Sequence, residues 1–199
     1  LGGSPMERWN PKDGDLYLNM LDKIHQTGGK YAGVLWYQGC SDTNPGPAEK
    51  YLEHFREYVE ATRKELGYEI PFFTMQLNRQ INGINDECWG MVRDAQARAA
   101  KEIPGVSVLT TSNLSLCDGI HNTAQANVAL GEKLAKQCAH VLNGKEEYQP
   151  PELVKVERAD EAERKSFQLE GSGIWLKLTC DHVKNCFLVY SAVGKDSGF

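Results

Sequence analysis

The segment Cys117–His121 places an aspartate three residues before a histidine, a pair that can carry out acid–base chemistry. At this spacing Asp118 can turn back and accept a hydrogen bond from Nδ1–H of His121, which directs Nε2 toward a nucleophile. The carboxylate would fix the imidazole tautomer and stabilise the imidazolium, as in Ser-His-Asp hydrolases. Spacing alone leaves a second interpretation open, in which Asp118 ends a turn and His121 leads into a helix that begins near Thr123.

Two other segments carry groups that could stabilise an oxyanion. Gln38 and Gly39 end an apolar run, where the side-chain amide is an N–H donor and the glycine permits close approach. In the alternative interpretation, Gln38 only satisfies backbone groups at the end of a strand. Gly2 and Gly3 either offer backbone N–H groups to an anion or form a flexible turn.

Such residues need a scaffold, and the apolar runs between turn residues indicate its strands. These runs do not alternate with polar residues, so we expect strands buried on both faces of a sheet, at residues 31–37, 71–77 and 106–111. The helices predicted from a 3.6-residue periodicity are 16–26, 47–66, 85–101 and 123–142. Helices that alternate with strands build a parallel sheet covered on its faces, and the sequence therefore predicts a three-layer α/β/α domain.

The candidate residues follow the predicted strands. Gln38 comes after the first strand, Asn78 and Arg79 after the second, and Asp118 and His121 after the third. Because ligands of open parallel sheets bind beyond the carboxyl ends of the strands, we expect these five residues at one edge of the sheet. Asn78 and Arg79 are the predicted substrate-binding residues.

The composition changes after Pro150 and Pro151. Short runs of strand type, without predicted helices between them, occupy residues 153–156, 166–169, 174–180 and 187–191. We therefore predict an α/β domain over residues 1–149 and the beginning of a β-rich, sandwich-like segment over 150–199.

Composition excludes several classes of function. The 199 residues carry a net charge of -5 without a block of Lys or Arg, so nucleic acid is not an expected partner. No apolar run is long enough to predict a membrane span. The six cysteines show no metal-ligand spacing and are expected to be buried free thiols, with Cys180 and Cys186 as the one pair close enough to consider for a disulfide. No GxGxxG or GKS/T loop is present, which disfavours a nucleotide-binding protein.

Three segments together resemble a known family. GGSPMERW (residues 2–9), GVLWYQG (33–39) and DGIH (118–121) are similar, in the same order, to the GG[TS]PxExW, GVxWYQGE and DGIHP motifs of sialate O-acetylesterases and related carbohydrate esterases of the SGNH superfamily. The resemblance implies an SGNH-like fold followed by a β-rich segment. It also implies that His121 is the general base and then the general acid, with Asp118 as its orienting partner. A backbone N–H of Gly2 or Gly3 and the amide of Gln38 would form the oxyanion hole.

The chain departs from the family in three respects. Cys40 stands where the family usually has Glu, and Asn122 where it has Pro. The family's nucleophilic serine lies in a GQSN-like turn upstream of GGSP, and this chain has no such turn. Ser4 matches a position whose hydroxyl is not the nucleophile. We therefore expect that the first strand and the nucleophile turn are missing, and that this chain alone is inactive.

The leading hypothesis is a carboxylic ester hydrolase that removes O-acetyl groups from sialic acid or a related glycan. It would need neither a cofactor nor a metal, and its partner would be the O-acetylated sugar. The family resemblance favours a periplasmic or extracellular location, and the sequence indicates no oligomeric state. The alternative is an SGNH-fold protein that binds carbohydrate through a degenerate site.

Overall fold

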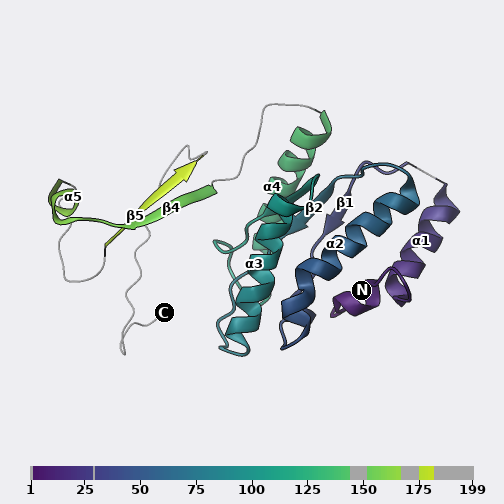
Figure 1. Cartoon of the computed structure of the whole chain (residues 1–199), viewed down its shortest axis with the longest axis horizontal. Helices are drawn as coiled ribbons and strands as arrows, with labels where there is room; N and C mark the ends of the chain where they lie inside the picture. The colour runs from purple at the N-terminus through teal and green to yellow at the C-terminus, as the bar shows by residue number, and fades with distance from the viewer. Residues whose placement is uncertain (1, 29, 144–151, 167–174, 182–199) are drawn as a thin grey trace. The chain divides into compact units, whose positions relative to one another are not determined.

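A computed structural model describes residues 2–28, 30–143, 152–166 and 175–181 (Figure 1). The chain divides into two compact units, Leu1–Glu146 and Glu147–Phe199. The first unit contains the predicted site.

The first unit alternates helices and strands as predicted. Its elements are η1 (Met6–Trp9), α1 (Asp15–Thr27), β1 (Val34–Trp36), η2 (Cys40–Asp42), α2 (Pro47–Leu66), β2 (Phe72–Met75), α3 (Asp86–Glu102), β3 (Val106–Leu109) and α4 (Ala124–Asn143). The strands form a parallel sheet in the order β1-β2-β3, in which Phe72 lies opposite both Val34 and Val106. The strands are shorter than the apolar runs that predicted them.

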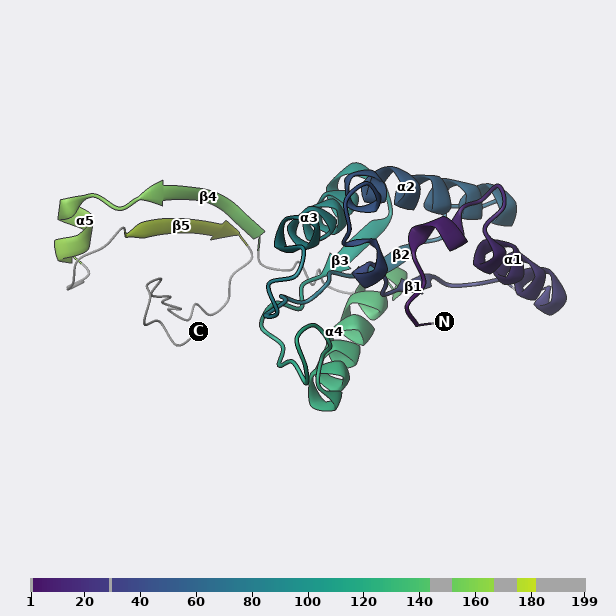
Figure 2. The same cartoon turned by 90° about the horizontal axis from the view of Figure 1, so that it is seen from below.

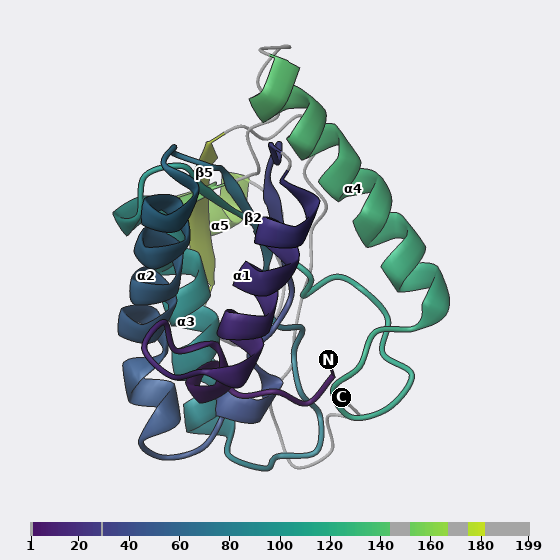
Figure 3. The same ribbon diagram turned by 90° about the vertical axis from the view of Figure 1, so that its right-hand side faces the viewer.

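The sheet is the middle of three layers. Successive residues of β2 point to opposite faces. Phe72 packs into the core under α2 and α3, whereas Phe73 and Met75 pack with α4. All four residues of β2 are buried, which confirms the predicted strand covered on both faces. The view in Figure 3 shows α4 on one side of the sheet and α1, α2 and α3 on the other.

Aromatic side chains dominate the core on the α2 side. Trp36 packs 4.7 Å from Tyr58 between ring centroids, and Phe55 contacts both rings. Trp36 and Trp89 are 6% and 5% exposed. Both tryptophans are therefore core residues, and neither can stack on a ligand.

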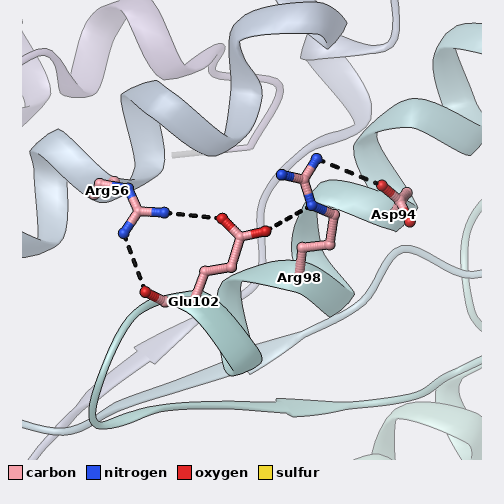
Figure 4. A network of polar contacts seen from close by, with 4 residues as sticks. All are labelled: Arg56, Asp94, Arg98 and Glu102. Carbon is pink, nitrogen blue, oxygen red and sulfur yellow. Dashed lines mark hydrogen bonds and ion pairs between the residues drawn. The ribbon is translucent and has the colours of Figure 1, made fainter.

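Helices α2 and α3 are also joined by polar contacts at the surface (Figure 4). Arg56 of α2 donates one hydrogen bond to the carbonyl oxygen of Glu102 and another to its carboxylate, each 3.1 Å long. Arg98 reaches the same carboxylate at 2.7 Å and lies 3.9 Å from Asp94. Because the last carbonyls of a helix lack intrahelical partners, Arg56 caps the C-terminus of α3 while linking it to α2.

One detail of α4 differs from the prediction. The 3.6-residue periodicity of this segment predicts an inward face formed by Val128, Leu130, Leu134, Cys138 and Val141. Leu130 and Leu134 are buried and Cys138 is partly buried, but Val128 is 65% and Val141 44% exposed. The buried stripe instead runs from Ala126 through Leu130 to Leu134, at the four-residue spacing that keeps side chains on one face.

The second unit contains an antiparallel pair, β4 (Glu152–Arg158) and β5 (Leu176–Asp181). The expectation of strands without intervening helices was wrong, because α5 (Glu161–Ser166) lies between them (Figure 2). A capping box begins this helix: Glu163 N–H donates to the Asp160 side chain at 2.8 Å, and Asp160 N–H to the Glu163 side chain at 3.1 Å. Ser166, predicted as the start of a strand, ends α5, and residues 167–169 and 187–191 lie outside the described residues.

The described cysteines are free thiols, as predicted, but the prediction that they are buried was wrong. Cys40, Cys88 and Cys138 are partly buried, and Cys117 and Cys180 are exposed. Cys186 lies outside the described ranges. Within those ranges, no helix has the length and apolar character needed to cross a membrane. The described residues also contain no group of three or more His, Cys, Asp or Glu side chains arranged to hold a metal ion.

Candidate active site

Asp118 and His121 form the contact that their spacing predicts. Nδ1 of His121 lies 2.7 Å from Oδ2 of Asp118. Because an ionised carboxylate only accepts hydrogen bonds, Nδ1 carries the proton and Nε2 is left as the basic nitrogen. Nε2 has no hydrogen-bond partner among the described residues, so it is available to a nucleophile.

The same carboxylate builds the turn that holds the histidine. Oδ1 of Asp118 accepts hydrogen bonds from the N–H groups of Ile120 and His121, each 2.7 Å long. These two bonds, followed by the bond to the imidazole, lower the pKa of Asp118 to about 2. The two interpretations of this motif are thus both present, since Asp118 is a turn residue and the partner of His121.

The loop is fixed from outside as well. Cys117 N–H donates to the carbonyl oxygen of His121 at 2.9 Å, and Ile81 N–H to that of Gly119 at 3.0 Å. A Cβ at Gly119 would lie 2.6 Å from the side-chain amide of Asn82. A side chain at position 119 would therefore displace the Asn82 side chain in the segment that follows β2.

Gln38 lies in the loop after β1, and its side chain is fully engaged. Nε2 donates to the carbonyl oxygen of Ser4 at 2.9 Å and to Oδ2 of Asp42 at 2.5 Å. The Tyr51 hydroxyl lies 3.1 Å from Oε1 of Gln38 and 3.0 Å from its backbone carbonyl oxygen. These contacts bring the segment that follows Gly3 against Gln38. Gly2 and Gly3 are exposed, and their N–H groups have no acceptor in the described parts of the chain.

Asp42 connects the two chain segments that carry the candidate oxyanion-hole residues. It is 3% exposed and accepts the Met6 N–H at 3.0 and 3.2 Å, besides the bond from Gln38. Burial raises the pKa of its carboxyl group, although the bonds from Gln38 and Met6 oppose the shift. Asp42 is not among the predicted site residues, because its contact with Met6 joins positions 36 residues apart in the sequence.

A pocket of about 220 Å³ connects the loops after β1 and β3. Its walls are formed by Tyr37, Gln38, Cys40, Leu77, Ile120, His121, Asn122 and Asn127. His121 and Gln38 therefore face the same space, as expected for residues beyond the carboxyl ends of parallel strands.

Asn122 organises the wall of this pocket. Its Nδ2 donates to the Tyr37 hydroxyl at 3.0 Å and to Oδ1 of Asn127 at 3.1 Å, and its Oδ1 accepts from Asn78 at 2.7 Å. The bond from Asn122 occupies the Tyr37 oxygen as acceptor. The Tyr37 hydroxyl hydrogen is thus left without an acceptor among the described residues.

Asn78 and Arg79 lie behind the pocket and are absent from its walls. Asn78 is 1% exposed and donates to Asn122 and to the carbonyl oxygen of Leu114. Arg79 donates to the carbonyl oxygens of Ser112 and Leu114 at 2.9 and 2.8 Å. The structure therefore shows both side chains supporting the loop after β3, and direct contact with a substrate stays a prediction.

Gln96 of α3 is a structural contributor that sequence reasoning missed. It is 4% exposed, donates to the carbonyl oxygen of Gln38 at 2.9 Å and accepts the Leu77 N–H at 2.8 Å. Gly39, at φ 145°, leaves room for this amide, because a Cβ would lie 2.9 Å from Nε2 of Gln96. A glutamine on the buried face of a predicted helix was the available signal, since buried amides need partners.

Cys40 lines the pocket without the properties of a nucleophile. Burial raises the pKa of its thiol, and the carboxylates of Asp118 and Asp42 act in the same direction. A thiol needs a lowered pKa or an adjacent base to become reactive at neutral pH. Cys40 is therefore a wall residue in this arrangement.

A parallel sheet with a His–Asp pair at its carboxyl edge is the arrangement of SGNH-type hydrolases. The chain belongs to the family described as carbohydrate esterase, sialic acid-specific acetylesterase, whose profile matches residues 1–140. It is 28% identical over 141 residues to a probable carbohydrate esterase of Arabidopsis thaliana, covering 68% of this chain and 51% of the relative. The chain thus spans about half the length of this curated relative.

Two solved structures are similar to this chain. The first is a protein from Arabidopsis thaliana, with a TM-score of 0.62, 26% identity, and coverage of 71% of this chain and 58% of that one. The second is a carbohydrate acetylesterase from Xanthomonas citri, with a TM-score of 0.66 and 26% identity. That match covers 79% of this chain and 39% of the other.

Proposed function

We propose that the full-length protein is a carbohydrate esterase that removes O-acetyl groups from sialic acid or a related acetylated glycan. The observation that carries the proposal is the 2.7 Å contact between Asp118 and His121, which leaves Nε2 of His121 facing the pocket that Gln38 also lines. Membership of an acetylesterase family supports the same chemistry.

The proposed reaction is acyl transfer through a serine supplied by sequence upstream of this chain. His121 removes the serine proton as the oxygen attacks the acetyl carbonyl, and the tetrahedral intermediate then expels the sugar oxygen, which takes that proton. Water, deprotonated by His121, next attacks the acetyl-serine, and the second tetrahedral intermediate expels the serine oxygen, which takes that proton from His121 as acetate is released. Asp118 holds the imidazole in the required tautomer throughout. No cofactor enters this sequence of steps.

The proposed oxyanion hole combines an N–H of Gly2 or Gly3 with the amide of Gln38. The glycine N–H groups have no present acceptor among the described residues, although neither glycine lines the pocket at His121. Gln38 must exchange one of its present acceptors, Ser4 O or Asp42, for the oxyanion, because both amide hydrogens are already donated. We also propose that Asn78 and Arg79 contribute to substrate binding, by holding Asn122 and the loop after β3 in place.

The alternative function is carbohydrate binding by a degenerate site. It is favoured by one observation, that no serine among the described residues lines the pocket at His121. Ser4 is buried, and its Oγ accepts a hydrogen bond from Trp9 at 3.2 Å. This chain alone would accordingly bind an acetylated sugar without turning it over.

The test is hydrolysis of O-acetylated sialic acid and of acetylated xylo-oligosaccharides by the full-length protein. We expect His121→Ala to lower kcat/KM by about a thousandfold, within the range for loss of a general base. His25→Ala is the matched control, because His25 is similarly exposed and contacts a carboxylate, Glu65, at 2.9 Å. Absence of turnover by the full-length wild-type protein would reject the esterase and favour the carbohydrate-binding alternative.

A further inference from the structure

A second cavity lies between η1 and the first half of α2. Its volume is about 350 Å³, larger than that of the pocket at His121. Asp42 contributes to its wall and also accepts the hydrogen bond from Gln38. A single side-chain contact, Gln38–Asp42, therefore links the two cavities.

Six polar side chains of the described residues line this cavity. Two of them, Asn10 and Asp42, accept hydrogen bonds from neighbouring residues. The side chains of the other four form no hydrogen bond or ion pair with another described residue, namely Glu7, Lys50, His54 and Glu57. Elsewhere on α2 some charged side chains are paired, as in the contacts of Arg56 with Glu102 (Figure 4), whereas others, such as Glu60 and Lys64, form no ion pair with another described residue. Two carboxylates, an ammonium group and an imidazole thus converge on one hollow with their hydrogen-bonding capacity unused.

Apart from Asn10, Asp42 and Gly46, the remaining wall is apolar. Pro5, Met6, Pro11 and Pro47 contribute to it, and Met6 is 2% exposed. Proline rings have fixed backbone geometry and present flat apolar faces. A cavity that combines such faces with a few convergent polar groups is typical of small-molecule sites.

The chemistry of the wall identifies the class of ligand. Sugar hydroxyl groups both donate and accept hydrogen bonds, so they can satisfy the carboxylates and the ammonium group together, while the C–H face of the ring covers the prolines. The cavity wall has more carboxylates than ammonium groups: it contains Glu7, Asp42 and Glu57 but, of the lysines, Lys50 alone among the described residues. Like charge therefore disfavours a sugar that carries its own carboxylate.

We propose that the cavity between η1 and α2 is a second carbohydrate subsite, specific for an uncharged sugar unit. Lys50 donates to sugar hydroxyl groups and Glu57 accepts from them. In the proposed esterase this subsite holds the uncharged sugar unit next to the acetylated one, and this assignment rests on the proposed function. Binding of the neutral sugar itself does not depend on catalysis.

The experiment measures binding of xylotriose and of N-acetylneuraminic acid to the full-length protein by calorimetry. We expect Lys50→Ala/Glu57→Ala to weaken xylotriose binding about tenfold, because two sets of hydrogen bonds are lost. Lys64→Ala/Glu60→Ala is the matched control: both residues are exposed on α2 and lie outside the cavity. Wild-type protein should bind xylotriose more tightly than N-acetylneuraminic acid.

A kinetic measurement separates the subsite from the catalytic site. In the Lys50→Ala/Glu57→Ala variant the KM for acetylated xylotriose should rise about tenfold, whereas kcat/KM for p-nitrophenyl acetate, which has no neighbouring sugar, should not change. Equal xylotriose binding by wild type and variant would overturn the proposal, as would equal weakening by the control pair. An enzyme inactive on all esters that still binds xylotriose through Lys50 and Glu57 would reject the proposed function and retain the subsite.

Discussion

Asp118 and Asp42 lie in loops at the same edge of the sheet, yet they have opposite surroundings. The Asp118 side chain is 51% exposed, whereas Asp42 is 3% exposed. Asp118 accepts from its own turn and from His121, within three residues. Asp42 accepts from Gln38 and from Met6, 36 residues away. The pKa of Asp118 is lowered and that of Asp42 is raised.

The difference separates two tasks of a carboxylate. A carboxylate that must stay ionised to support an imidazolium gains from backbone N–H donors and needs little burial. A carboxylate that holds two chain segments together is buried with them, and burial disfavours its charge. The loop after β3 therefore orients a reacting group, whereas the loop after β1 maintains the architecture next to it.

The difference between the two loops can be tested by substitution, and we expect the largest effect, a loss of catalysis, at Gln38. This residue contacts Asp42 and also faces the pocket of His121. If Gln38 donates to the oxyanion, Gln38→Ala should reduce kcat of the full-length esterase about a hundredfold, or roughly 3 kcal/mol. The measurement is kcat and KM on an O-acetylated sugar. A loss confined to KM would contradict the role in the oxyanion hole.

Tyr51→Phe provides the control for Gln38. It removes the hydroxyl that contacts Gln38 O and Oε1 but leaves the amide hydrogens and their acceptors in place. We expect a much smaller fall in kcat than for Gln38→Ala. Equal losses in the two variants would mean that only the position of Gln38 matters.

A smaller effect is expected on stability at Asp42. Asp42→Ala leaves the buried Met6 N–H and one amide hydrogen of Gln38 without an acceptor, which should lower the free energy of unfolding by about 1–3 kcal/mol. Urea denaturation measures this change. Asp118→Ala is the comparison, because its partners are exposed to water. If the Asp118 variant were destabilised as much as the Asp42 variant, the division between the two loops would be wrong.

The sequence predicted features that depend on neighbours along the chain. Helix α2 has the predicted bounds, because Pro47 suits a first turn and Gly67, at φ 75°, suits the C-cap. The contact of Asp118 with His121 was also predictable, since its atoms are three residues apart. Helix α5 was not predicted although its capping box is local, because the apolar runs on either side of it predict successive strands without a helix between them.

Features that depend on distant contacts were not predictable. Gln38 bonds to Ser4, and Gln96 to Gln38, across 34 and 58 residues. No spacing rule relates such positions, and the pairing appears only when η1, α3 and the loop after β1 meet. The burial of Asn78 is another example, because its location after a strand predicted a ligand contact whereas its partners lie in the loop after β3.

The smallest expected effect is a difference in how stability depends on pH. The pKa of Asp118 in the folded state is about 2, below its ordinary value of 3.8, so its contribution to stability is present above about pH 4 and is lost as the pH falls toward 2. The pKa of Asp42 is raised, so the folded state keeps its proton longer than the unfolded state, and stability falls as the pH rises through the interval above 3.8. Urea unfolding of wild type, Asp118→Asn and Asp42→Asn between about pH 2 and pH 6 measures both contributions. Compared with the Asp118→Asn variant, the wild type should gain stability as the pH rises. Compared with the Asp42→Asn variant, it should lose stability as the pH rises. If the two differences in unfolding free energy changed with pH in the same direction, the two carboxylates would not differ as their surroundings indicate.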